Sequence, residues 1–352
     1  MAEIVSTKSE DRVAWLSSGF VHSRLILQRQ GALLVLVLLV LFATFRYDGF
    51  LTPFNIFKLL SYNSYFGLIA LGMTFVIMTG GIDLSVGSLA ALTSVVAALV
   101  SPHGLLITLA ACLAVGIGVG VINGWAIALL KIPPFITTLA TLLAARGLAL
   151  LLSNNASVNV DSTSDFTTIA NNITFGFNIF GIGSIPIVVL ILIVAYVIGS
   201  LVLNFTRFGR HVLAVGGNEE AARLMGLPVD RIIFTVYVMS GILAALAGVF
   251  LAAQTFTGIP NEGVGWELTA IAAVVVGGTL LSGGMGSVLT SLVGVLLLGL
   301  IFNILDFENG RGLISITSFW QSVIRGAFLL VVVILQSRLT RTRGKADLGR
   351  TA

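Results

Sequence analysis

Long apolar runs are the feature that most constrains how this chain can fold. Ten of them recur along the 352 residues, and most approach or exceed the roughly 18 residues that mark a membrane-spanning helix. The chain is 57% hydrophobic and only 10% charged. Because lipid offers the backbone no hydrogen bonds, we predict an all-α polytopic membrane protein with about ten transmembrane helices. The predicted spans are residues 31–47, 59–79, 84–100, 105–129, 135–152, 185–204, 232–253, 266–281, 286–304 and 317–336.

The spans define one membrane domain between two polar tails. Residues 1–30 are the N-terminal tail, in which residues 11–30 either form an amphipathic helix at the membrane surface or have no fixed structure. The membrane domain covers residues 31–337, and residues 338–352 form the C-terminal tail.

The placement of basic residues predicts the orientation. Lys and Arg gather in both tails, at Lys131 and in the loop 205–231, whereas the other connections hold few of them. The positive-inside rule then places both termini in the cytoplasm and residues 153–184 outside. Because the basic residues flank spans, they do not indicate a nucleic-acid partner.

Two glycine-interrupted segments echo each other in the two halves of the chain. One runs through residues 76–81 into 84–89, and the other through residues 274–278 into 281–289. Paired breaks of this kind mark the substrate pathway of many transporters, although Gly-Gly pairs can also simply allow helices to cross closely. The candidate pathway residues are Gly80, Gly81, Asp83, Ser85, Gly277, Gly278, Thr279 and Ser282.

Few charges fall inside the predicted spans. Asp83 either caps the following helix or contacts substrate hydroxyls or a cation. Arg146 and Arg325 lie within spans, so each must pair inside the bundle, face water or contact substrate. The chain has no cluster of metal-ligand residues, no phosphate-binding loop motif and no catalytic constellation. We therefore expect no bound metal or cofactor and no enzymatic activity.

A short polar stretch, residues 217–226, predicts a small helix on the water side. Asn218 is a suitable N-cap, Glu219 and Glu220 suit the positive end of the helix dipole, and Gly226 can end the helix in the left-handed conformation. Such a helix either docks into a groove on a partner or simply connects two spans.

Over residues 30–337 the chain resembles the membrane permease subunits of bacterial monosaccharide ABC importers, of the ribose and galactofuranose type. Within that group it looks closest to a galactofuranose-importer permease. Leu280 and Met285 stand where the family often has Ser and Arg, which weakens a ribose assignment. The matching stretches are Gly72-Met73-Thr74-Phe75-Val76-Ile77, Gly80-Gly81-Ile82-Asp83-Leu84-Ser85-Val86-Gly87-Ser88, Lys131-Ile132-Pro133-Pro134-Phe135-Ile136-Thr137-Thr138-Leu139-Ala140, residues 206–226, and Gly277-Gly278-Thr279-Leu280-Leu281-Ser282-Gly283-Gly284.

The resemblance implies a multi-pass subunit of the bacterial inner membrane that carries a neutral monosaccharide. Its implied partners are a second permease, identical or related, two cytoplasmic ATPase subunits that use the ATP, and a periplasmic sugar-binding protein. The alternative is a self-sufficient secondary transporter or facilitator for a small polar solute, which would need no docking helix. The residues implied to couple to the ATPase are Gly217, Asn218, Glu219, Ala222, Leu224, Met225 and Gly226.

Overall fold

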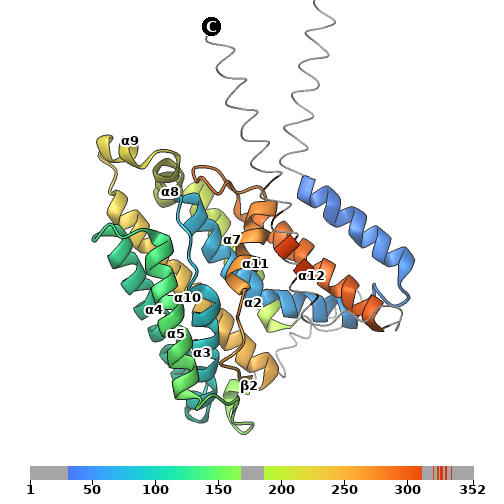
Figure 1. Cartoon of the computed structure of the whole chain (residues 1–352). Helices are drawn as coiled ribbons and strands as arrows, with labels where there is room; N and C mark the ends of the chain where they lie inside the picture. Colours follow the sequence, from blue (N-terminus) through green and yellow to red (C-terminus); the bar gives the residue numbers. More distant parts are fainter. Residues whose placement is uncertain are drawn as a thin grey trace, which may run out of the picture.

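The computed structural model describes residues 31–167 and 186–310, together with the single positions 320, 323, 324, 326, 327, 330 and 334. Within this part of the chain, seven helices are long and apolar enough to cross a membrane. This confirms the prediction of an all-α polytopic membrane fold (Figure 1). The seven are α2 (Pro53–Met78), α3 (Val86–Val100, continued by the 3₁₀ turn η1, Ser101–His103), α4 (Leu105–Ala128), α5 (Pro134–Leu152), α7 (Ile187–Phe205), α10 (Val229–Thr255) and α12 (Val288–Gly310).

Shorter elements complete the described part of the chain. An apolar helix covers Gly31–Arg46, close to the first predicted span. The predicted tenth span, apart from the single positions, and both tails lie outside the described residues, so the count of ten remains a prediction. The other elements are α8 (Arg207–Gly217), α9 (Glu219–Leu224), α11 (Trp266–Val276), the 3₁₀ turn η2 (Asp165–Thr167), and the antiparallel pair β1 (Val158–Asn159) and β2 (Thr257–Gly258).

Local capping decides where α2 begins. Its N-cap is Thr52, whose hydroxyl accepts a hydrogen bond from the backbone N–H of Asn55, and Pro53 occupies the first turn. Proline is favoured there because its fixed φ suits a helix and its missing N–H needs no partner. The helix therefore starts six residues before the predicted residue 59, in a mixed stretch where Asn55 and Lys58 interrupt the apolar run.

The eighth predicted span, 266–281, is too long. Helix α11 has 11 residues and ends at Val276, so it is only about 16 Å long, roughly half of the hydrocarbon core. It ends because Gly278 adopts a positive φ of 92°, which a continuing helix does not allow. At its other end Trp266 stacks on Tyr65, a residue near the middle of α2, with 4.9 Å between ring centroids. Helix α11 thus begins halfway along a full-length span.

Helix α10 packs against α2, α3 and α4 at the centre of the bundle. The crossing of α10 and α4 depends on glycine, because a Cβ atom on Gly241 would overlap the carbonyl oxygen of Gly116. Helices α4 and α5 lie side by side at one edge of the molecule, as Figure 1 shows. Their outward faces expose large apolar side chains, among them Leu106, Leu143 and Leu151, as expected for contact with lipid.

A leucine at Gly241 tests this close crossing. We expect Gly241→Leu to lower the free energy of unfolding by about 1–3 kcal/mol, because the added side chain has no space between α4 and α10. Thermal unfolding of the purified protein in detergent measures the change. Gly118→Leu is the matched control, since a Cβ at Gly118 would meet nothing within 4 Å. Equal stability of the two variants would contradict the crossing.

Candidate functional site

Helices α8 and α9 form the polar connection between spans α7 and α10. The prediction of a capped helix here is confirmed for α9: the Asn218 side chain accepts from the backbone N–H of Ala221 at 2.9 Å. Gly226 closes the helix with a φ of 79°, and the N–H of Leu227 returns to the carbonyl of Ala222. Helix α8 was not predicted. The Thr206 side chain caps it by accepting from the N–H of Gly209.

The exposed tip of α9 is apolar. Leu224, the last residue of α9, and Met225, its C-cap, are 84% and 71% exposed, although the rest of this surface helix is largely polar. Ala222, which we expected on the same docking face, is 0% exposed. It packs in the chain's own core, beneath the exposed tip, and its role in coupling remains a prediction.

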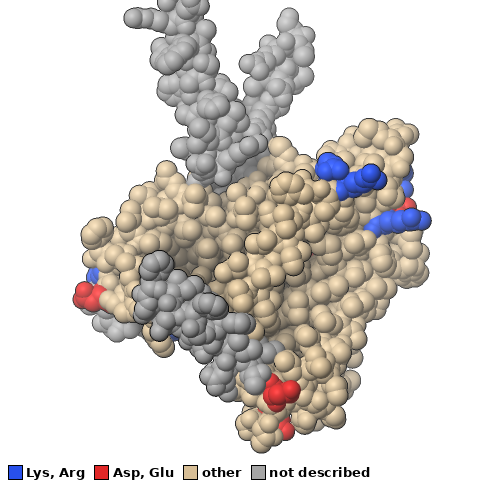
Figure 2. All heavy atoms as spheres, turned by 180° about the vertical axis from the view of Figure 1, so that it is seen from behind, with Lys and Arg blue, Asp and Glu red and all other residues tan. Residues whose placement is uncertain are grey.

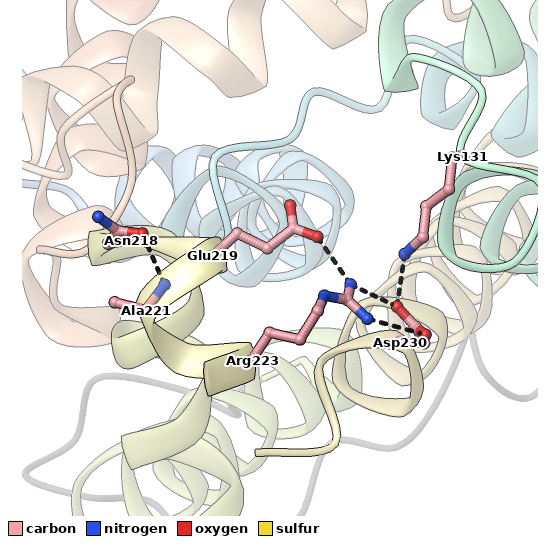
Figure 3. A network of polar contacts seen from close by, with 6 residues as sticks. All are labelled: Lys131, Asn218, Glu219, Ala221, Arg223 and Asp230. Atoms are coloured by element: carbon pink, nitrogen blue, oxygen red, sulfur yellow. Dashed lines mark hydrogen bonds and ion pairs between the residues drawn. The ribbon is translucent and has the colours of Figure 1, made fainter. Parts of the chain in front are cut away.

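A chain of ion pairs fixes α9 to two neighbouring elements (Figure 3). Arg223 of α9 bonds to Glu219 at 3.0 Å and to Asp230, in the first turn of α10, at 2.8 Å. Lys131, in the turn between α4 and α5, also binds Asp230. The hydrogen bonds that Arg223 donates to Asp230 and to Glu219 raise the pKa of its guanidinium above the ordinary value. The i,i+4 spacing in the sequence predicts the pair of Glu219 and Arg223. The pair of Lys131 and Asp230 cannot be predicted in this way, because the two residues are 99 positions apart.

The two glycine breaks end their helices in the same way. After α2, Gly80 has a φ of 81° and the N–H of Gly81 bonds to the carbonyl of Val76. After α11, Gly278 has a φ of 92° and the N–H of Thr279 bonds to the carbonyl of Val274. Both are Schellman caps, which require a residue that tolerates positive φ. The likeness concerns these helix ends, and the repeat of the wider segments remains a prediction.

The predicted pathway residues divide into buried and exposed ones. Gly81, Asp83, Ser85, Gly277 and Thr279 are buried. Gly80, Gly278 and Ser282 are exposed in this single chain, and they lie close together: a Cβ on Gly80 would be 3.7 Å from the carbonyl oxygen of Ser282. The structure therefore brings the two breaks to one place.

Asp83 is the centre of a buried polar network. Its carboxylate accepts from the N–H and the hydroxyl of Ser85, at 3.0 and 2.6 Å, and from the hydroxyl of Ser240 at 2.8 Å. Asn123 extends the network by donating to the Ser85 hydroxyl, and the hydroxyl of Thr141 donates to Asn123. The bond to the Ser85 N–H holds the turn that enters α3, but the N-cap of α3 is Ser85 itself, so the expected capping role of Asp83 is not confirmed. Within the described ranges no cationic side chain forms a salt bridge with Asp83.

Arg146 supports the segment that leads into α11. Its guanidinium donates to the backbone carbonyls of Pro260 and Glu262. The same segment runs along α3: a Cβ on Gly258 would touch Ser94, and one on Gly87 would overlap the carbonyl oxygen of Gly263. Residues 258–263 thus descend beside α3 as irregular backbone, which at membrane depth must be buried in protein or line a cavity. Arg146 pairs inside the bundle, whereas Arg325 lies outside the described residues.

Charge is distributed unevenly over the surface. In Figure 2 most of the visible Lys and Arg side chains gather at the end that bears α8 and α9, and the visible acidic groups lie mainly away from it. Among the described residues, no group of three or more His, Cys, Asp or Glu could hold a metal ion.

Comparison with known proteins places the chain in a family. Residues 55–333 match the family model described as "Branched-chain amino acid transport system / permease component". The chain belongs to this permease family. The permease is 40% identical over 323 residues to a ribose import permease protein of Bacillus subtilis, covering 90% of this chain and 95% of the relative.

Two further relatives cover a similar length. The permease is 37% identical over 317 residues to a ribose import permease protein of Escherichia coli, covering 89% of this chain and 94% of the relative. It is 38% identical over 326 residues to an L-arabinose transport system permease protein of Escherichia coli, covering 90% and 92%. No solved structure matches the chain.

The first break allows a sharp test of local packing in the permease. A Cβ on Gly81 would overlap the hydroxyl oxygen of Tyr237, so Gly81→Ala should destabilise the protein. Tyr237→Phe removes that oxygen and should restore part of the loss in the double variant. Thermal unfolding of the four proteins gives the coupling free energy, which we expect to be about 1 kcal/mol. Additive effects of the two substitutions would refute this contact.

Proposed function

We propose that this chain is the membrane-spanning subunit of an ATP-driven importer that carries a neutral monosaccharide into a bacterial cell. The observation that carries the proposal is the similarity, over about nine-tenths of the chain, to permeases named for ribose and L-arabinose import. The family description names branched-chain amino acids, but these individual relatives are named for sugars. Galactofuranose, or a similar sugar, remains our expectation for the specific substrate.

The chemistry of the breaks supports an uncharged substrate. The ammonium group of a zwitterionic amino acid pairs best with a fixed anion, whereas the Asp83 carboxylate is already satisfied by hydroxyl and N–H groups. We propose that the exposed residues Gly80, Gly278 and Ser282 face the passage. The buried members of the set, Gly81, Asp83, Ser85, Gly277 and Thr279, would hold the shape of the two breaks.

The tip of α9 supports docking of a cytoplasmic ATPase subunit. Two large apolar side chains, Leu224 and Met225, are exposed on a capped and ion-paired helix outside the spans. A partner groove that covers them would gain the free energy of burying apolar surface. Asn218, Gly217 and Gly226 would fix the ends of the helix, and Glu219 its rotation. A self-sufficient facilitator has no need of such a tip. A second permease and a periplasmic sugar-binding protein complete the proposed assembly.

Removing the apolar tip tests the docking proposal. The double variant Leu224→Gln and Met225→Gln should lose most co-purifying ATPase, and sugar-stimulated ATP hydrolysis in proteoliposomes should fall at least tenfold. Leu106→Gln is the matched control, because Leu106 is equally exposed (81%) but lies at the start of α4. Undiminished assembly and hydrolysis in the double variant would rule out α9 as the docking element.

The proposed orientation has its own test. Cysteines replacing Ser162 and Glu220 should react with a membrane-impermeant maleimide from opposite sides of intact cells, Ser162→Cys from outside and Glu220→Cys only after lysis. Both positions are exposed, whereas the native Cys112 is buried and should react slowly. Labelling of both positions from the same side would overturn the orientation that the basic residues predict.

A further inference from the structure

The end of α8 lies directly against both glycine breaks. A Cβ atom on Gly216 would overlap the carbonyl oxygen of Met78, the last residue of α2, and would lie 2.6 Å from the backbone nitrogen of Gly284. A Cβ on Gly283 would lie 2.8 Å from the carbonyl oxygen of Gly216 and 2.9 Å from the backbone nitrogen of Gly80. Three backbones therefore meet here with no side chain between them.

A hydrogen bond ties the two breaks together at the same point. The N–H of Gly284 donates to the carbonyl of Met78 at 3.0 Å. That carbonyl belongs to the last turn of α2, where helical C=O groups lack intrahelical partners. The second break thus satisfies the end of the first, and Gly216 packs on the atoms of that bond.

The rest of α8 is held to the bundle by its apolar face. Val212 and Val215 are buried, and the ring of Phe208 lies 6.5 Å from the ring of Phe75 in α2. The opposite face bears the exposed Arg207 and Arg210. Since close-packed interiors transmit displacements rather than absorb them, movement of α8 must shift the chain at both breaks.

We propose that Gly216 is a positioning residue that makes α8 and the two breaks move as one body. The inference rests on the proposed function: an ATPase that displaces α9 would displace α8, and with it the end of α2 and residues 283–284 of the second break. A side chain at residue 216 would force α8 away from the Met78–Gly284 bond. The ATPase would then still dock at Leu224 and Met225, but the substrate pathway would no longer respond to its movement.

The first test is Gly216→Ala in the assembled complex with its ATPase, binding protein and sugar. We expect normal co-purification of the ATPase, retained basal ATP hydrolysis, and at least a tenfold loss of sugar-stimulated hydrolysis and uptake. Gly118→Ala is the control for a helical Gly→Ala change in open space, and it should behave as the unmodified complex. Normal coupling in Gly216→Ala would overturn the inference.

A second measurement does not depend on how well that variant folds. In a Cys112→Ala background, nitroxide labels are attached in pairs at Arg210→Cys in α8, Met285→Cys in the second break and Leu143→Cys on α5, all of them exposed positions. On adding a non-hydrolysable ATP analogue to the complex, the distance between residues 210 and 285 should stay constant. The distances from each of them to residue 143 should change together.

The outcomes separate this inference from the proposed function. A change between residues 210 and 285 as large as the change to residue 143, or no change in any pair, would overturn the one-body movement. Failure of the function proposal would show instead as a complex that does not form or that hydrolyses ATP without any response to sugar. Loss of ATPase docking in Gly216→Ala would count against the inference, because residue 216 is proposed to transmit movement from α8 to the breaks and not to bind the ATPase.

Discussion

The hydrogen bond from the N–H of Gly284 to the carbonyl of Met78 is the interaction on which the arrangement of the breaks depends. Two interrupted helices leave polar backbone groups inside an apolar bundle, where each unsatisfied group costs free energy. Schellman caps satisfy part of them at Gly80 and Gly278, and this bond joins the first cap to the loop that follows the second. Only residues without a side chain allow the approach, which explains why glycine occurs at both breaks and at Gly216.

The hydrogen bonds of the buried Asp83 carboxylate and of the Arg146 guanidinium go to neutral partners. Asp83 accepts from hydroxyl and backbone N–H groups, and Arg146 donates to backbone carbonyls. These hydrogen bonds fix the positions of the Asp83 carboxylate and the Arg146 guanidinium. Irregular backbone at the depth of the bilayer would be costly in contact with lipid. The irregular segment 258–263 avoids this contact because it packs against α3 and accepts hydrogen bonds from Arg146.

Apolar run length and capping residues predicted most of this fold, because these are local properties. They located the long spans and the caps of α9 at Asn218 and Gly226. The short length of α11 was not predicted, because apolar residues continue in the sequence past Val276. The Gly277-Gly278 pair that ends the helix was nevertheless visible in the sequence. The burial of Ala222 and the partnership of Lys131 with Asp230 depend on contacts between distant segments, which one sequence does not reveal. The adjacent glycines 216 and 217 were a readable signal of close backbone approach that periodicity overlooked.

The short α11 also bears on how the protein responds to the membrane potential. The start of a helix carries about half a positive charge, and here Glu267 lies in its first turn and interacts electrostatically with Arg146. These opposite charges are grouped together, so a movement that carries them as a group transfers little net charge across the bilayer. A full elementary charge would couple to the field by about 2.3 kcal/mol per 100 mV. Rearrangement around α11 should therefore be nearly electroneutral, so the membrane potential should contribute little to its free energy.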